Sequence, residues 1–422
     1  MLDIHFIKAH PELITEAARK KHIDFNVQEL LDTDKSRVEL VQEVEGMRRE
    51  QNEITNRIKS GVSEEERNQL ISEMQIFKGT LKEKEEKLKE VMVVWQSLML
   101  KVPNIPDMSV PEGKEDSDNV EIKKEGNIPE FDFPIKDHVE LMTSLDMVDF
   151  ERGVKVSGFR GYILKGMGAR LAMALWQYTL NFFVQKGYTP LMVPSLVSRK
   201  TLVGTGYLPG GEDDLYVTQD DEYLAGTGEV ATMAYHSGEI LEKSDLPKKF
   251  ITFSPCFRRE AGSHSKDTKG LIRVHEFFKL EQVVLCEASH QISVELHEEL
   301  ERNAEELMES LEIPYHVVLN CGGDLGQGQV KKYDIEAWVP SQSTYRETHS
   351  CSYFHDFQTR RLNIRYREDD GELLFAHSLN NTALATPRAL VPLVENFQNA
   401  DGSITVPKVL VPYMGTDKIT LQ

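Results

Sequence analysis

The segment CFRREAGSHSKDTKGLIRVHEFFKLEQ, residues 256–282, decides the fold predicted for this chain. Strand-like runs flank it, with FITFSPCFRRE leading in and IRVHEFFKLEQVVL leading out. Five basic residues lie within its residues 258–273, namely Arg258, Arg259, Lys266, Lys269 and Arg273, and acidic residues are interspersed along the segment. Because successive side chains of a strand point to opposite faces, we expect Arg258, Glu260, Arg273 and Glu281 to form a polar floor on one sheet face. A solvated surface loop is the plainer alternative.

The rest of the C-terminal two thirds mixes strand runs with helices. ARLAMALWQYTLNFFVQKG (169–187) and residues 292–311 have helical periodicity, and YHVVLN, YDIEAWVP and RLNIRYR resemble strands. Residues 370–398 are predicted as strand, turn and helix. Two prolines in YTPLMVPSLV (188–197) indicate an edge or irregular strand. Long gaps between strand runs, without regular helix alternation, favour an α+β fold, in which helices flank an antiparallel sheet.

Toward the N-terminus the composition changes. Between Val27 and Leu100 there is no proline, and apolar residues recur at three- and four-residue steps, as in a coiled-coil seam. The expected seam residues are Val27, Leu31, Val38, Val41, Val44, Ile54, Ile58, Leu70, Met74, Phe77, Leu81, Leu88, Met92, Trp95 and Leu98. Ser60-Gly61-Val62-Ser63 interrupts the pattern, and Ser63 before three glutamates is typical of a helix N-cap. We therefore predict a long antiparallel helical hairpin over about residues 27–100, with an arm about 45–50 Å long.

Periodicity alone does not assign a role to this hairpin. A dimerisation coiled coil and a structural stalk are both open alternatives. Residues 26–100 hold 16 acidic and 12 basic side chains, so RNA contact does not follow from composition. A Pro- and Asp-rich linker follows, and the predicted organisation is residues 1–101, a linker at 102–125, and a second domain at 126–422.

Bulk properties exclude several protein classes. The chain has 422 residues and a net charge of −20, which argues against nonspecific nucleic-acid binding, so no DNA partner is expected. There is no apolar run of 18 residues and no signal-peptide pattern. The four cysteines are far apart, as in reduced thiols of a reducing compartment. We expect a cytoplasmic protein of two or three domains without a membrane span or a structural zinc site.

Common nucleotide motifs are absent. GTGYLPGGEDD (204–214) fails as a dinucleotide motif because Pro209 replaces the third glycine. Without a P-loop, ATP phosphates would need arginine side chains, and Arg258, Arg273 and Arg388 are the candidates. His349, Cys351 and His355 could bind a metal, but a polar strand end with a buried cysteine is the favoured interpretation.

Several motifs together resemble the seryl-tRNA synthetases, a family of class II aminoacyl-tRNA synthetases. FRREAGSHSKDTKGLIRVHEFFKLE resembles the second class motif, SLNNTALATPRALVPLVENFQ the third, and GYTPLMVP the first. The hairpin, VPNIPD, FDFPIKDHVEL and GDLGQGQVKKYDIEAWVPSQSTYRETHSCS extend the resemblance over essentially the whole chain.

The resemblance implies a homodimer that joins serine to ATP as seryl-adenylate and transfers serine to the terminal adenosine of tRNA. The first domain would be the tRNA-binding arm, with tRNA(Ser) as partner and tRNA(Sec) as a second candidate, and residues 126–422 the catalytic domain. ATP and Mg²⁺ would be the cofactors.

Site residues also follow from the resemblance. It implies catalytic roles for Arg258, Glu260 and Arg388, with Glu260 facing the adenine amino group and Arg388 and Phe277 sandwiching the ring. For serine it implies Thr227, Gly228, Glu229, Arg258, Glu281, Asn380 and Thr382, with the first three in a recognition strand. For ATP it implies Arg258, Arg259, Glu260, Arg273, Val274, Phe277, Glu347, Thr348, His349, Ser350 and Arg388. Glu347 and Ser350 would hold Mg²⁺, and Pro194 would lie at the dimer interface.

The chain departs from the family pattern at five places, and two of them are the less usual residues Arg259 and His264. Gly228 stands where alanine is usual, Asn381-Thr382 where Gly-Ser is usual, and Pro387 where glycine is common. Thr382 has a second interpretation as a helix N-cap, and Glu229 one as a structural strand acid.

Two other functions are open. One is a synthetase-like ligase that loads an amino acid onto a carrier protein, although such relatives lack a long helical arm. The other is an inactive paralogue that binds RNA or protein through the arm, although the charged groups of the site are retained.

Overall fold

The structure, a computed structural model, describes residues 1–261, 267 and 269–421. Lys266 of the charged segment lies outside these residues. The chain divides into two compact units. One contains Leu2–Arg19 and Ile23–Pro103, and the other contains Met1, Lys20–His22 and Asn104–Gln422.

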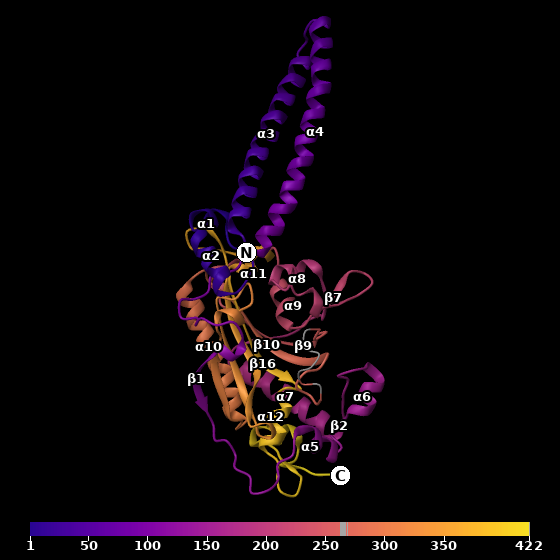
Figure 1. Cartoon of the computed structure of the whole chain (residues 1–422), viewed down its shortest axis with the longest axis vertical. Helices are drawn as coiled ribbons and strands as arrows, with labels where there is room; N and C mark the ends of the chain where they lie inside the picture. The colour runs from indigo at the N-terminus through magenta and orange to yellow at the C-terminus, as the bar shows by residue number, and fades with distance from the viewer. Residues whose placement is uncertain (262–266, 268, 422) are drawn as a thin grey trace. The chain divides into compact units, whose positions relative to one another are not determined.

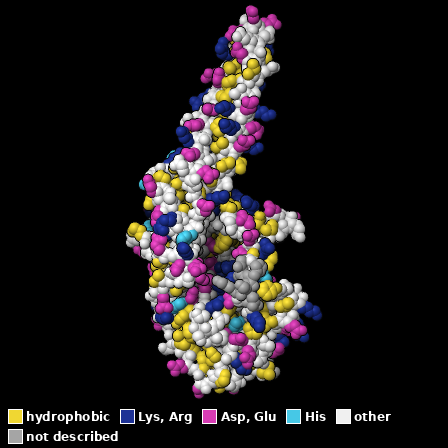
Figure 2. All heavy atoms as spheres, viewed as in Figure 1, with side chains coloured by type: hydrophobic (Ala, Val, Ile, Leu, Met, Phe, Trp, Pro, Cys, Tyr) yellow, Lys and Arg dark blue, Asp and Glu magenta, His cyan; other side chains and the backbone are white. Residues whose placement is uncertain are grey.

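The N-terminal unit is helical. Two short helices, α1 (Ile4–Ala9) and α2 (Pro11–Lys20), precede the long helices α3 (Val27–Lys59) and α4 (Glu64–Lys101). Ser63 caps α4 by accepting a hydrogen bond from the Glu66 amide, so the predicted helix break is confirmed. Ion pairs Arg48–Glu85, Lys84–Glu43 and Arg57–Glu66, each at 2.7 Å, link α3 to α4 as an antiparallel hairpin. Charges of both signs are interspersed along this hairpin (Figure 2).

The apolar seam of the hairpin differs in part from the prediction. Val44, Leu70, Met74 and Leu81 are buried as expected, but Leu30, Asp34 and Leu40 of α3 were missed. Asp34 is fully buried because Lys8 and Arg37 pair with its carboxylate. The Arg37 guanidinium also lies 4.7 Å from the centre of the Trp95 ring. A buried, neutralised acid therefore occupies a seam position in which periodicity predicts an apolar residue.

An eight-stranded sheet organises the larger unit, and its strands β9, β10 and β16 run side by side in Figure 1. The strand order is β1-β11-β12-β13-β16-β10-β9-β4, and only the β4–β9 pair is parallel. The strands are β1 (Val120–Glu125), β4 (Thr189–Met192), β9 (Lys248–Phe257), β10 (Glu276–Cys286), β11 (Tyr315–Leu319), β12 (Lys331–Val339), β13 (Thr344–His355) and β16 (His377–Thr386). The predicted antiparallel α+β fold is confirmed, and β4 with Pro190 is an edge strand as expected.

Helices cover the two faces of this sheet unequally. On one face α7 (Gly166–Gln185), α10 (His290–Ser310) and α12 (Leu390–Asn396) form the main core with residues such as Leu280 and Val284. On the other face α9 (Gly228–Ala234) and α11 (Phe357–Leu362) pack on Val283 and Leu285 in a smaller core. The β10 residues on this second face that precede Val283 are Phe277, Lys279 and Glu281, and they form the floor of the candidate site.

Smaller elements surround the sheet. The helices are α5 (His138–Ser144), α6 (Phe150–Ser157), α8 (Arg199–Thr205) and α13 (Val411–Met414). The strands are β2 (Val148–Asp149), β3 (Ile163–Leu164), β5 (Leu196–Ser198), β6 (Tyr216–Val217), β7 (Glu222–Leu224), β8 (Ile240–Glu242), β14 (Arg365–Arg367), β15 (Leu373–Phe375), β17 (Ile404–Thr405) and β18 (Lys418–Ile419). Within the described residues, no helix has both the length and the hydropathy of a membrane span.

Two local predictions were wrong, and so was the N-cap alternative for Thr382. In RLNIRYR only Arg365–Arg367 are a strand, because α11 continues to Leu362 and Asn363 ends it in the left-handed region at φ 54°. Thr227 is the N-cap of α9, so Gly228 and Glu229 begin a helix and are not in a strand. Thr382 lies inside β16 and not at a helix N-cap.

Candidate active site

The hairpin of β9 and β10 builds the floor of the site. Its register pairs Thr252 with Glu281 and Cys256 with Phe277, so these residues point to the same face. Arg258 follows β9 directly, and its guanidinium lies 5.4 Å from the centre of the Phe277 ring. Arg258 also donates to the Gly226 carbonyl at 3.3 Å, which ties the end of β9 to the segment before α9.

Two β-bulges bring further predicted residues onto this face. Leu280 pairs with Leu384 but Glu281 pairs with Thr382, so Ala383 is an extra residue in β16. Thr382 therefore lies opposite Glu281, on the same side of the sheet. Asn380 pairs with Val283 in the same register and points to this face as well.

The second bulge is in β13. Ile335 pairs with His349 and Glu336 with Glu347, so Thr348 is the extra residue. In a regular strand Glu347 and Ser350 would point to opposite faces, since side chains alternate. The bulge restores them to a common face, where the two predicted Mg²⁺-binding residues are brought together.

The start of α9 lies next to the floor of the site. Thr227 accepts a hydrogen bond from the Glu229 amide as N-cap. The buried Glu229 carboxylate accepts from the Tyr207 hydroxyl at 2.9 Å and from the Gln358 amide at 2.6 Å. These two donors fix the carboxylate, which gives Glu229 a defined orientation in the site.

Two buried carboxylates approach each other here, and their electrostatics are linked. Burial raises the pKa of Glu229 to about 6, and the nearby Glu281 adds to the increase. Burial also raises the pKa of Glu281, while Lys279 and then Arg258 oppose the increase. Two acids and two cations in one buried cluster are suited to a zwitterionic ligand such as an amino acid.

Arginine side chains surround the open side of the floor. Arg273 pairs with Glu260 at 2.7 Å. Arg388 pairs with Glu347 at 3.2 Å and donates to the Ile272 carbonyl. Arg258, Arg273 and Arg388 thus come from three different segments and are held near carboxylates that an anionic ligand could replace as partners.

Two predicted ATP-binding residues, Thr348 and His349, do not turn their side chains to this face, and two others differ in exposure. Arg259 is exposed and Val274 is buried. The hydroxyl of Thr348 donates to the Ile335 carbonyl, and the buried His349 ring contacts Thr348 and the Ala383 carbonyl. Contacts of Val274, Thr348 and His349 with a nucleotide would therefore go through the backbone.

The metal-binding capacity of the site rests on oxygen donors. Within the described residues no group of three or more His, Cys, Asp or Glu side chains could hold a metal ion. Of the three residues considered as metal ligands, Cys351 is buried and the His349 ring contacts Thr348 and the Ala383 carbonyl. Glu347 and Ser350 would offer two hard oxygen atoms, a donor set that fits Mg²⁺ because that ion takes its remaining ligands from phosphates and water.

Sequence reasoning missed four groups of the site. Lys279 is buried beside Glu281, and Tyr207 and Gln358 hold Glu229. The hydroxyl groups of Thr252 and Thr232 form a hydrogen bond of 2.8 Å. The two-residue spacing of Lys279 and Glu281 was a usable signal, since such residues share a strand face. No sequence signal connects Tyr207 and Gln358 to Glu229, because they are 22 and 129 residues away.

A side chain at Gly228 would be crowded by two neighbouring side chains. A Cβ atom there would lie 2.9 Å from Ser254 Oγ and 3.0 Å from Thr252 Cγ2. We expect Gly228→Ala to displace the start of α9, with Thr227 and Glu229, and to weaken about tenfold the binding of serine, the ligand that the resemblance implies for these residues, because overpacking costs about 1–3 kcal/mol. Calorimetric titration of serine is the measurement, and the ATP dissociation constant should change little.

Two further variants check this prediction. Adding Thr252→Ala should recover part of the serine affinity by removing one of the two close approaches. Gly46→Ala in α3, where a Cβ would meet no atom within 4 Å, should leave serine binding unchanged. An unaltered serine affinity in Gly228→Ala would contradict the crowding.

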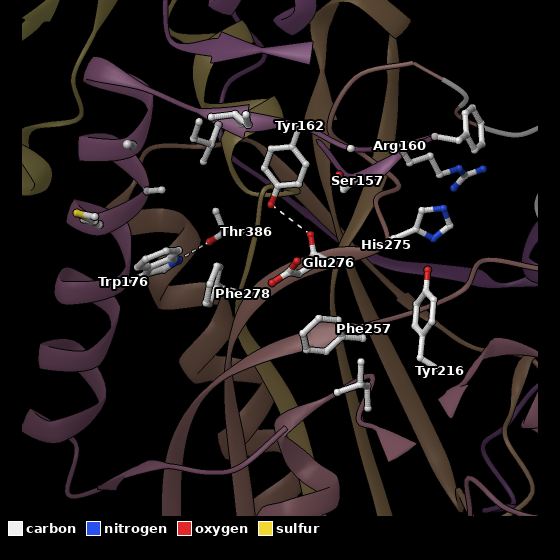
Figure 3. A pocket seen from close by; sticks show the side chains of 18 residues that line it. Ser157, Arg160, Tyr162, Trp176, Tyr216, Phe257, His275, Glu276, Phe278 and Thr386 are labelled. Carbon is white, nitrogen blue, oxygen red and sulfur yellow. Dashed lines mark hydrogen bonds between the residues drawn. The ribbon is translucent and has the colours of Figure 1, made fainter. Parts of the chain in front are cut away.

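A separate cavity lies on the opposite side of β9 and β10. It has a volume of about 500 Å³, and no residue predicted for serine or ATP lines it. Trp176, Phe257 and Phe278 form much of its apolar wall, and Glu276 lies at its centre in Figure 3. Tyr162 donates to the Glu276 carbonyl at 3.3 Å, and Trp176 to the Thr386 hydroxyl at 2.7 Å.

Comparison with known proteins agrees with this geometry. Residues 215–397 match the family described as tRNA synthetase class II core domain (G, H, P, S and T). The chain therefore contains the catalytic core of a class II aminoacyl-tRNA synthetase, and the sheet, bulges and arginines described above lie within or beside it.

Further matches identify the family within this class. Residues 1–106 match the seryl-tRNA synthetase N-terminal domain. The serine–tRNA ligase of Deinococcus radiodurans is 48% identical over 98% of both chains. The crystal structure of seryl-tRNA synthetase from Pyrococcus horikoshii complexed with ATP has a TM-score of 0.89 at 37% identity and covers 100% of both chains. That of cytoplasmic serine–tRNA ligase from Naegleria fowleri in complex with AMP has a TM-score of 0.87 at 30% identity and covers 100% of this chain and 99% of that one.

The chain belongs to the seryl-tRNA synthetase family, the serine–tRNA ligases of class II. The predicted family and enzyme class are confirmed.

Proposed function

We propose that this chain activates L-serine with ATP to form seryl-adenylate and transfers serine to the 3′-terminal adenosine of tRNA(Ser). The observation that carries the proposal is the convergence of Arg258, Glu281 and Glu229 on one sheet face. An amino acid is a zwitterion, and this cluster offers a guanidinium for its carboxylate and two carboxylates for its ammonium. The ATP-bound relative from Pyrococcus horikoshii supports ATP as the second substrate.

Adenylate formation requires positioning and neutralisation of charge more than proton transfer. The serine carboxylate attacks the α-phosphate, and pyrophosphate leaves. Arg258 would contact both reacting groups and stabilise the charge that develops between them. Arg273 and Arg388 would bind the triphosphate, with Phe277 and Arg388 on the two sides of the adenine and Glu260 near its amino group. Glu347 and Ser350 would hold Mg²⁺, which neutralises phosphate charge when bound.

Selection of serine depends on its hydroxyl. Thr382 lies opposite Glu281 in the sheet, so both could contact a hydroxyl at the same position. A buried carboxylate without its donor forgoes hydrogen bonds that water cannot replace, so alanine should be rejected strongly. Asn380, Thr227 and Gly228 would complete the wall of the serine pocket.

Serine-dependent exchange of pyrophosphate into ATP tests the first step. We expect exchange with serine and not with alanine, threonine or glycine. Charging of tRNA(Ser) then separates a tRNA synthetase from a ligase that loads a carrier protein. A chain without exchange for any amino acid would be an inactive paralogue, and exchange with another amino acid would refute the substrate.

We further propose that residues 1–101 form the tRNA-binding arm, 102–125 a linker and 126–422 the catalytic domain. The match of residues 1–106 to the family's N-terminal domain supports the first assignment. tRNA(Sec) is a second candidate substrate, and a charging assay with each purified tRNA distinguishes them. Four cysteines that are all free and buried support a reducing compartment, the cytoplasm.

We also propose a homodimer. Exposed apolar side chains lie on α6, β3, α7 and β4, and two of them, Ile163 and Met173, also line the cavity of Figure 3. Met173 is 62% exposed and Met192 is 85% exposed, and Pro194 is exposed two residues beyond β4. An apolar patch of this kind usually marks a protein interface, and it includes the predicted interface residue.

Met173→Asp should convert the dimer into a monomer. An aspartate in the apolar centre of an interface would be buried without a partner, which costs several kcal/mol. Light scattering coupled to gel filtration should give twice the 48.2 kDa chain mass for the unmodified protein and one chain mass for the variant. Ile76→Asp in α4 changes an equally exposed apolar residue and should remain dimeric. A monomeric unmodified protein would refute the interface.

A further inference from the structure

Lys279 is a buried cation in the floor of the candidate site. Its side chain is 7% exposed, and its ammonium lies 2.5 Å from the carboxylate of Glu281, which is 3% exposed. The two residues are separated by one position in β10 and therefore share a face. Both side chains are almost fully buried, so the interaction is not a surface ion pair.

The other charged groups around this pair come from different elements. Glu229 approaches from the start of α9, and Arg258 from the end of β9. The Cys256 thiol on β9 also faces Lys279, and burial raises its pKa. Arg258 and Lys279 are thus the cations that balance the carboxylates of Glu229 and Glu281.

A buried ion pair by itself adds little to the stability of a fold. Removing two charges from water costs about as much as their attraction returns, and well-packed apolar residues often do as well. An ion pair in the floor of a ligand site calls for another explanation. In the proposed reaction Arg258 binds the serine carboxylate and the α-phosphate, so Lys279 remains as the cation dedicated to Glu281.

We propose that Lys279 is a positioning residue that orients the Glu281 carboxylate toward the serine ammonium and so sets the affinity for serine. This inference rests on the proposed function. Lys279 engages one side of the carboxylate and leaves the other for the substrate. It also offsets the burial of Glu281, which would otherwise favour the neutral acid, a form that attracts an ammonium only weakly.

Lys279→Met tests the inference, because methionine has similar length and no charge. Steady-state pyrophosphate exchange should show a serine KM at least about 30-fold higher at pH 7, since the substitution removes one partner of a buried pair. The ATP KM should stay within about twofold of the unmodified enzyme, because the arginines that would bind the nucleotide are unchanged.

The pH profile separates positioning from structure. Removal of the cation raises the Glu281 pKa further, so the carboxylate forms only at higher pH. From pH 6.5 to 8.5 the serine KM of Lys279→Met should therefore fall steeply, while that of the unmodified enzyme changes little. Lys279→Arg keeps the charge and should show a flat profile with partial affinity.

Controls make each outcome decisive. Lys249 lies on the neighbouring strand β9 and pairs with Glu299. Lys249→Met should therefore not alter the serine KM. If Lys279→Met does not fold, Lys279→Gln carries the same expectation. An unchanged serine KM, or equal increases for serine and ATP without a pH slope, would overturn the role of Lys279. Absence of serine-dependent exchange in the unmodified enzyme would instead refute the proposed function.

Discussion

Arg258→Ala is expected to reduce the rate of serine-dependent pyrophosphate exchange by about a thousandfold, because a single preorganised donor to developing charge contributes about 10²–10³ or more. Arg258 is the one residue of the site assigned to both substrates. Its side chain is held by the Gly226 carbonyl and the Phe277 ring, so the guanidinium needs little reorganisation when the substrates bind.

The fold should survive this substitution. Arg258 is only partly buried, and its removal leaves Glu281 still paired with Lys279. The melting temperature should therefore change by a few degrees at most, whereas both kcat and kcat/KM fall. Arg302→Ala, in a surface cluster with Glu309, is the matched control and should retain full exchange. Normal exchange by Arg258→Ala would refute the site assignment.

Removal of the helical arm should abolish tRNA charging and spare adenylate formation. The hairpin and the catalytic sheet belong to separate compact units, and the proposed serine and ATP residues all lie in the second unit. A tRNA held only at its acceptor end would bind through few of its phosphates, and affinity for a nucleic acid depends on how many phosphates the protein neutralises. Charging at micromolar tRNA should become undetectable, while exchange stays within about twofold.

The structure indicates where the chain should be cut. Asp34 is buried between Lys8 and Arg37, and Arg37 contacts Trp95, so a deletion must keep the base of the hairpin. Replacing residues 47–82 by a short Gly-Ser turn retains these interactions and the Glu43–Lys84 pair. Normal aminoacylation by the shortened protein would show that the arm is not the tRNA reader.

Some features of the hairpin and the sheet are local, and the sequence predicts them well. Ser63 and the glutamates after it define a helix start by their own hydrogen bonds. Pro190 restricts β4 to a sheet edge because proline lacks an amide donor. The strand runs on either side of residues 258–275 predicted the β9–β10 hairpin, but Arg258, Glu260 and Arg273 lie outside both strands, so alternation along a strand placed only Glu281 of the four on the floor.

Other features depend on partners far away in the chain. Whether Glu347 and Ser350 share a face is decided by the bulge at Thr348, and whether Thr382 faces Glu281 by the bulge at Ala383. A bulge is defined by the register with a neighbouring strand. Its position therefore could not be predicted by counting residues along one strand. The helix that begins at Gly228 was missed for a related reason, because its short length and its close packing on Thr252 and Ser254 are tertiary features.

The sequence by itself therefore determined the fold class, the helical arm and the identities of the charged groups, because periodicity, capping and motif spacing are properties of contiguous residues. Only the tertiary structure decided which of those groups meet. It buried Lys279 against Glu281, fixed Glu229 with Tyr207 and Gln358, and turned His349 away. Burial and electrostatic coupling arise between segments brought together by folding, and no single segment carries them.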